Sequence, residues 1–330
     1  MSRPALAIGA IVTALVQNAL APAPTVAQDW PTRPLTMVVP YAAGGATDVI
    51  GRVFSSHLSE ILGQQVIVEN IGGAGGMIGA QRVAKAPPDG YQFVLGTAGT
   101  HAQNQTLYKN PLYNAATDFT PVALVAEVPL VLVARNDLPA NSLQEFIVYA
   151  HAKRARMNFG SAGAGSSSHL ACALLNAAIG VDVTHIAYRG GGPAMQDLIA
   201  KRIDYQCPNA TAAIPMLEGN LVKAIAILTR NRSPVLPNLA SAREQGLNDF
   251  EVDNWLAIFL PRGVPARIIR KLHEATVATM DRPALQGRLR ELGTDVIAAD
   301  RRSSDYLQSF VAREIKKWGA VIKENELAMN

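Results

Sequence analysis

Two glycine loops carry residue types that could bind an anion. The first is Tyr41-Ala42-Ala43-Gly44-Gly45-Ala46-Thr47-Asp48, and the second is Gly160-Ser161-Ala162-Gly163-Ala164-Gly165-Ser166-Ser167-Ser168-His169. Each loop follows a short apolar run that is typical of a strand and leads into a segment with helical periodicity. Free backbone N–H groups at a helix start, at the positive end of the helix dipole, favour a bound anion. The sequence therefore predicts two anion-binding loops.

Other chemistries fit these loops poorly. Neither loop has the G-K-[ST] ending of a phosphate loop, and Gly72–Gly79 does not give G-x-G-x-x-G in register. The run Ser166–His169 has no G-x-S-x-G elbow, and His169 is too close along the chain to act as base for an adjacent serine. The six histidines form no metal-binding motif. We therefore expect no cofactor, no metal and no enzymatic activity.

A third polar turn, Thr97–Asn104, follows another predicted strand. Thr100 could cap a helix and still leave N–H donors exposed, so we include it among the ligand contacts. Asp48 has two possible roles, because it could fix the first loop by accepting backbone N–H bonds or could touch the ligand. A bare carboxylate would repel an anion, which favours the structural role.

Composition and the N-terminus place the chain in a compartment. The 330 residues carry a net charge of +4 with no basic stripe, which argues against nucleic-acid binding. Arg3, the apolar run Ala5–Ala21 and the small residues Thr25-Val26-Ala27 are typical of a secretory signal peptide cleaved near Ala27. A membrane anchor is the alternative, but the run is short and holds Gln17-Asn18. We expect residues 1–27 to be removed and the mature protein to be periplasmic.

If the protein is exported, Cys172 and Cys207 have two possible states. In an oxidising compartment they could form a disulfide. They could equally be two buried small hydrophobic residues.

From Leu35 onward, predicted strands and helices alternate, which implies parallel sheets with right-handed crossovers. We expect two α/β lobes joined by two crossings: residues 28–130 with 254–330 as lobe 1, and residues 131–253 as lobe 2. Ligands bind such sheets at the carboxyl ends of the strands. The expected strands are 35–41, 65–69, 93–97, 122–134 (interrupted at Pro129), 157–161, 183–188, 203–207, 222–228 and 250–260. The expected helices are 47–62, 77–85, 142–152, 169–179, 192–200, 212–218, 265–280, 283–292 and 303–325.

Nine motifs, taken in chain order, resemble the periplasmic solute receptors of tripartite tricarboxylate transporters, the Bug or TctC family. The resemblance covers essentially the whole mature chain. It implies a two-lobed type II periplasmic binding protein, each lobe a mainly parallel sheet flanked by helices. Such a receptor closes like a Venus flytrap on a small carboxylate and delivers it to inner-membrane permease subunits. The motifs are Pro40–Asp48, Val68–Asn70 with Gly75-Gly76, Ala86–Tyr91, Gly99–Ala102, Asp118–Val122, Phe159–Gly163 with His169, Tyr188–Gly191, Arg232–Pro234 and Trp255.

The resemblance also implies that the two loops hold the ligand mainly through backbone amides, hydroxyls and bridging waters. Where many relatives carry an acidic residue, this chain has Cys207-Pro208-Asn209, which disfavours amino acids and favours plain di- or tricarboxylates. We expect a monomer that hinges near Pro129–Arg135 and Asn254–Phe259. The candidate ligand contacts are Tyr41, Gly44, Gly45, Ala46, Thr47, Asp48 and Thr100 in lobe 1, and Ser161, Gly163, Ser166, Ser167, His169, Tyr188, Asp204 and Asn209 in lobe 2.

Two other functions fit the same residues. The pocket could belong to the ligand-binding subunit of a periplasmic sensing system. A hydrolase that uses Ser168 or His169 is the enzymatic alternative.

Overall fold

Two β-sheets organise the computed structural model, which describes residues 30–328, so the predicted signal peptide lies outside the described residues. Residues 30–32 belong to an N-terminal unit separate from the rest of the chain, which begins at Arg33. The first sheet contains, in spatial order, β11 (Asp295–Val296), β4 (Phe119–Pro129), β10 (Asp253–Pro261), β3 (Gln92–Thr97), β1 (Leu35–Val39) and β2 (Val66–Asn70). The second contains β7 (Thr184–Ala187), β6 (Asn158–Ser161), β8 (Tyr205–Gln206), β5 (Val131–Arg135) and β9 (Val222–Ile227).

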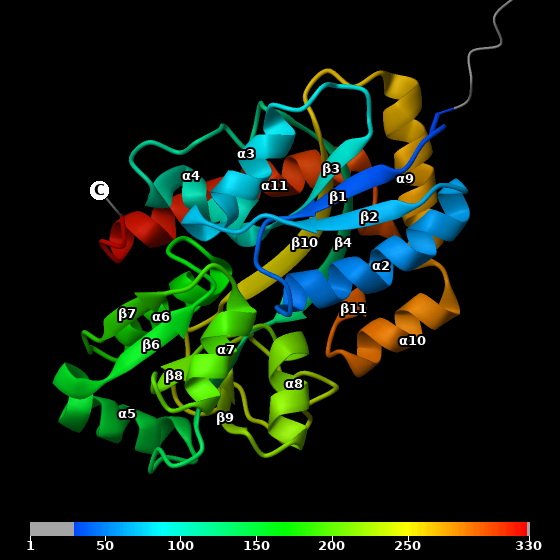
Figure 1. The fold of residues 1–330 in the computed structure, drawn as a ribbon. Helices are drawn as coiled ribbons and strands as arrows, with labels where there is room; N and C mark the ends of the chain where they lie inside the picture. Colours follow the sequence, from blue (N-terminus) through cyan, green and yellow to red (C-terminus); the bar gives the residue numbers. More distant parts are fainter. Residues whose placement is uncertain (1–29, 329–330) are drawn as a thin grey trace, which may run out of the picture. The chain divides into compact units, whose positions relative to one another are not determined.

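Both sheets are mixed, which refines the expectation of mainly parallel sheets. Strands β1, β2 and β3 pair in parallel, and so do β6, β7 and β8. The long strand β10 is antiparallel to β3 and β4, and β5 is antiparallel to β8 and β9. The chain crosses between the sheets twice (Figure 1): β4 leads through Leu130 into β5, and β10 returns to the first sheet after β9.

The helices lie close to their predicted ranges. Gly63 ends α2 in the left-handed conformation at φ 66°, where glycine carries no steric penalty. Among the described residues, no helix has both the length and the apolar character needed to cross a membrane. The α-helices are α2 (Ala46–Leu62), α3 (Met77–Ala84), α4 (Asn104–Leu107), α5 (Leu143–Lys153), α6 (Ser167–Ala178), α7 (Gly191–Ile199), α8 (Ala210–Glu218), α9 (Ala266–Met280), α10 (Pro283–Glu291) and α11 (Ser304–Glu324), with short turns η1 (Ala74–Gly76), η2 (Gly99–Gln103, a π-helix), η3 (Arg154–Arg156) and η4 (Ala299–Arg301).

Alternate side chains of the first sheet face different helices. A Cβ placed on Gly51 of α2 would touch Val39, Leu95 and Met37, so α2 covers that face. The intervening residues Val38 and Val94 belong to one buried cluster with side chains of α3 and α11. Alternation along a strand sends neighbouring residues to opposite faces, so these helices cover the other side.

The apolar stripe of the last helix docks on the first sheet, as its periodicity predicts. Leu307, Val311, Trp318 and Ile322 of α11 are buried. The Glu314 carboxylate accepts the indole N–H of Trp255 in β10 at 3.0 Å and that of Trp318 at 3.2 Å. The crossing strand is therefore anchored from behind by a helix.

A disulfide joins Cys172 of α6 to Cys207, which follows β8, with the two Cα atoms 5.6 Å apart. Both residues are also fully buried, so the bond and the packing role coexist. The bond fixes the first turns of α6 beside the segment Pro208-Asn209.

Removal of this disulfide by the double change Cys172→Ala and Cys207→Ala is expected to lower the free energy of unfolding by about 2–4 kcal/mol, because the unfolded chain gains freedom. Urea denaturation of the mature protein measures this. Equal urea midpoints for the oxidised wild type and the double variant would contradict the expected stabilisation.

Candidate functional site

A small pocket of about 50 Å³ lies where the two glycine loops meet. Its walls come from the ends of β3 and β10 in the first sheet and from loops and helix starts that follow strands of both sheets. Seven predicted contacts line it: Tyr41, Gly45, Ala46, Thr47, Ser166, Ser167 and Asn209. Seven further residues complete the lining: Thr97, Ala162, Ser168, Gly191, Pro208, Ala212 and Asn254.

The first loop presents the uncapped start of α2 to this pocket. Gly45 precedes the helix in an extended conformation, and no side chain caps it. The first-turn N–H groups at Ala46 and Thr47 are therefore available at the pocket, together with the positive end of the helix dipole. Such an arrangement can accept an anion without a charged side chain.

Asp48 supports this loop from behind. Its carboxylate accepts bonds from the Gly44 N–H and the Asn70 side-chain amide, each at 2.9 Å, and pairs with Arg52. Burial opposes ionisation of Asp48, but the bonds from Arg52, Gly44 and Asn70 outweigh it and lower the pKa. Neither Gly44 nor Asp48 lines the pocket, so the structural role favoured from the sequence fits the geometry.

The second loop is shaped by its own hydroxyl groups. Ser166 caps α6, since its Oγ accepts the His169 N–H at 3.2 Å and donates to the Gly163 carbonyl at 2.7 Å. The cap explains why α6 begins at Ser167, before the predicted start at His169. The Ser168 Oγ accepts the Ala162 N–H at 3.0 Å.

Ser161, Gly163 and His169 stand behind the lining of the second loop. The Ser161 Oγ accepts the Gly163 N–H at 3.1 Å. The His169 Nδ1 accepts the Gly165 N–H at 3.3 Å, so the ring proton resides on Nε2. Among the described residues, no hydrogen bond links His169 to Ser168, the two residues of the hydrolase alternative.

The imidazoles near this loop are neutral. His169 stacks on His185 with ring centroids 4.1 Å apart, and the His185 Nε2 lies 2.7 Å from the Ser161 Oγ. Burial, with a smaller contribution from His185, lowers the pKa of His169 to about 3, and burial lowers the pKa of His185 to about 4. At neutral pH these rings shape the loop and add no positive charge to it.

The third turn contributes Thr97 to the pocket instead of Thr100. The Thr100 Oγ1 accepts the Thr97 N–H at 2.9 Å and is fully buried. The Thr97 Oγ1 lies 3.0 Å from the Tyr41 hydroxyl at the pocket wall. Burial raises the pKa of Tyr41 to about 12, so its phenol remains protonated.

Two predicted rim residues are engaged elsewhere. The Tyr188 hydroxyl donates to Asp197 at 2.7 Å. The Asp204 carboxylate pairs with the Arg135 Nε at 2.9 Å and accepts the Asn158 N–H at 2.8 Å. Neither side chain lines the pocket.

Asn254 is one of the pocket residues that were not predicted from the sequence as ligand contacts. It lies in β10, is 2% exposed, and its Oδ1 accepts the Ser167 hydroxyl at 2.9 Å. Its Nδ2 donates to the Asn209 Oδ1 at 3.0 Å, and the Ser167 Oγ accepts the Gly99 N–H at 3.1 Å. The sequence feature that could have identified it is a single amide side chain immediately before the apolar run of the crossing strand.

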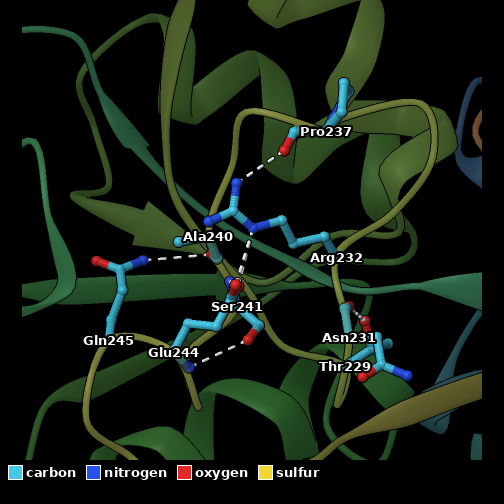
Figure 2. A network of polar contacts seen from close by, with 8 residues as sticks. All are labelled: Thr229, Asn231, Arg232, Pro237, Ala240, Ser241, Glu244 and Gln245. Carbon is cyan, nitrogen blue, oxygen red and sulfur yellow. Dashed lines mark hydrogen bonds and ion pairs between the residues drawn. The ribbon is translucent and has the colours of Figure 1, made fainter.

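The pocket lining contains no Asp, Glu, Lys, Arg or His. The conspicuous Arg232 of the Arg232–Pro234 motif is already paired, as Figure 2 shows: its Nε contacts both Glu244 oxygens at 3.0 Å, and its Nη1 donates to the Pro237 carbonyl. That loop borders a neighbouring cavity of about 660 Å³, which shares Asn254 with the pocket. Within residues 30–328, no three His, Cys, Asp or Glu side chains gather as metal ligands.

Comparisons with known proteins agree on one family. A family model described as the tripartite tricarboxylate transporter family receptor matches residues 50–327. The structure of the periplasmic binding protein BugD is 37% identical, with a TM-score of 0.89 over 91% of this chain and 100% of that one. MatC from Rhodopseudomonas palustris with bound malate is 39% identical, with a TM-score of 0.86 over 89% and 100%. Rpa4515 from R. palustris with adipate is 36% identical, with a TM-score of 0.86 over 91% and 99%.

The neutral histidines predict a pH dependence of stability. The pKa of His185 is about 6.5 in the unfolded chain and about 4 when folded. The unfolded chain therefore binds more protons between these values, and the stabilisation present above pH 6.5 is lost as the pH falls toward 4. His185→Gln should show a smaller loss over this window than the wild type in urea denaturation.

Subtracting the pH dependence of the unfolding free energy of His185→Gln from that of the wild type cancels the contributions of carboxyl groups, which both proteins share. One of these is Asp253, whose pKa is raised to about 7 by burial and by its bond to Glu251. Identical slopes of unfolding free energy against pH in the wild type and His185→Gln would show that His185 is not held neutral.

Proposed function

Since the chain belongs to the tripartite tricarboxylate transporter family of receptors, we propose that it captures a small di- or tricarboxylate in the periplasm for an inner-membrane permease. The observation that carries this proposal is the pocket between the starts of α2 and α6, with no charged side chain in its lining. Two helix starts in one pocket provide two anion seats, which matches a ligand with more than one carboxylate.

Neutral donors suit an anionic ligand that must be released again. A buried ion pair carries a large desolvation cost and loses much when one partner leaves. Backbone amides, the Thr47 hydroxyl and bridging waters can instead satisfy the carboxylate oxygens, while the Ser167 hydroxyl, which donates to Asn254, holds the start of α6 in place. Because burial keeps the Tyr41 phenol protonated, the wall that it forms carries no negative charge near neutral pH.

The ligands in the neighbouring structures support this class. MatC is described with malate and Rpa4515 with adipate, and both ligands carry two carboxylates. In this chain, Asn209 lines the pocket and accepts a bond from Asn254. Because the lining offers no carboxylate to pair with an ammonium group, we infer that plain organic acids are preferred over amino acids.

Ligand entry requires the lobes to separate. The pocket of about 50 Å³ is smaller than the roughly 300–1,000 Å³ typical of small-molecule sites. We assign lobe 1 to residues 28–130 with 254–330 and lobe 2 to residues 131–253. Hinge motion near Pro129–Arg135 and Asn254–Phe259 would open and close them, with ligand stabilising the closed form. The proposal includes export by the N-terminal signal peptide and a monomeric receptor.

A ligand screen tests the proposed class. Thermal-shift measurements should show raised melting temperatures with dicarboxylates from succinate to suberate or with citrate, because a ligand that binds only the folded state stabilises it. Amino acids and neutral sugars serve as comparison sets. Stabilisation by sugars alone would contradict the carboxylate assignment.

The two hydroxyls at the anion seats give a sharper test. Thr47→Ala combined with Ser167→Ala should weaken binding of the best acid by about 1–3 kcal/mol in total, because the first change removes a donor to a charged group and the second removes the hydroxyl that joins the start of α6 to Gly99 and Asn254. Isothermal calorimetry measures the loss. Thr184→Ala, at an exposed position of β7, is the matched control and should bind as the wild type does. Unchanged affinity in the double variant would remove these hydroxyls from the site.

A further inference from the structure

Two glycine-rich segments bring the lobes together without forming the anion seats. Ile71–Gly76 belongs to the first lobe and contributes nothing to the pocket lining, and Arg189–Gly192 of the second lobe contributes only Gly191. Both segments nevertheless contact the opposite lobe through backbone atoms. Their glycines therefore need an explanation other than ligand contact.

The first seam joins the loop before α2 to the segment before α7. The Ala42 N–H donates to the Arg189 carbonyl at 3.0 Å across the lobes. A Cβ on Gly72 would lie 2.3 Å from the same carbonyl oxygen. A Cβ on Gly190 would lie 2.8 Å from the Ala42 nitrogen and 2.9 Å from the Ala42 Cβ, well inside ordinary contact of 3.4–4 Å.

The second seam lies beside Ser166. A Cβ on Gly75 would lie 2.3 Å from the Ala164 carbonyl oxygen, and one on Gly165 would lie 2.3 Å from the Asn104 Oδ1. The Tyr108 hydroxyl donates to that Ala164 carbonyl at 2.7 Å. At the first seam backbone meets backbone, and at the second the Gly75 backbone meets the Ala164 carbonyl while the Asn104 and Tyr108 side chains contact the same loop.

At Gly190 the reason for glycine is the close approach of another segment and not the backbone conformation. Its φ of 172° is extended backbone that any residue adopts. Its three nearest would-be contacts all belong to Ala42 in the other lobe. The requirement for glycine at this position is therefore the closeness of the lobes.

We propose that the two seams are a closure stop that sets the separation of the anion-binding loops and so selects ligands by length. This inference rests on the proposed carboxylate function. The first seam adjoins the anion-binding loop at the start of α2. A Cβ on Gly45 would lie 3.5 Å from the Gly191 nitrogen, and one on Gly192 would lie 3.0 Å from the Ala43 oxygen. Close-packed backbone does not compress, so the stop defines a fixed gap. A diacid that spans this gap engages both seats at full closure.

Gly190→Ala tests the stop, because its added methyl meets Ala42, and neither residue lines the pocket. Calorimetry with linear dicarboxylates from malonate to azelate should show weaker binding of the shortest wild-type ligands, by about tenfold, and an optimum displaced to a longer acid. Gly192→Ala, which meets the Ala43 oxygen, should shift the optimum in the same direction. Equal weakening of all acids, or an unchanged profile in both variants, would overturn the inference.

The matched control is Gly287→Ala in α10, where an added Cβ has no atom within 4 Å. This variant should keep the wild-type length profile. Melting temperatures of all three variants establish that they are folded before the profiles are compared.

A distance measurement tests the stop independently of which acid binds. Spin labels at Lys85→Cys and Lys153→Cys, both exposed and on different lobes, give a label-to-label distance distribution by double electron–electron resonance. The shortest distance in that distribution corresponds to the most closed form. That distance should be longer in Gly190→Ala than in the parent, with and without added acid. A parent that binds no dicarboxylate would contradict the proposed function, whereas equal shortest distances would overturn the closure stop.

Discussion

The Ser167 hydroxyl is the contact on which the site depends. It accepts the Gly99 N–H from the turn after β3 and donates to Asn254 of the crossing strand β10, while its own backbone begins α6. Three parts of the chain thus meet at one oxygen. Asn254 extends the link to Asn209, and the neighbouring Trp255 is held by Glu314 from α11. The position of the crossing strand therefore bears directly on the pocket.

A second constraint is electrostatic, because no charged side chain lines the pocket that we propose binds the anion. Arg52 pairs with Asp48, Arg135 with Asp204 and Arg232 with Glu244, all outside the lining. The histidines behind the second loop are neutral because they are buried. What remains at the pocket is a set of backbone and hydroxyl dipoles with fixed directions, and such dipoles can bind an anion without a buried ion pair.

The parts that could be predicted from sequence are those fixed by local chemistry. Ser142 predicts the start of α5, and its hydroxyl does accept the Glu145 N–H. Gly63 predicts the end of α2, and both glycine loops precede helices as expected. These outcomes depend on interactions within a few residues, which a linear sequence displays directly.

The parts that escaped prediction depend on partners far apart along the chain. The Arg135 partner of Asp204 is 69 residues away, and Asn254 is 87 residues from Ser167. Antiparallel entry of β10 between β3 and β4 decides which polar side chain reaches the pocket, and no local pattern encodes that register. In the same way, Thr97 and not Thr100 faces the pocket, because the turn folds Thr100 back onto the strand.

A crystal structure of the mature protein with a bound dicarboxylate tests the central claim most directly. The account predicts one carboxylate at the N–H groups of Ala46 and Thr47 and the other at the start of α6 beside Ser167, with no arginine or lysine in contact. A ligand held by Arg230 or Arg290 in the larger neighbouring cavity, which those residues line, would contradict it.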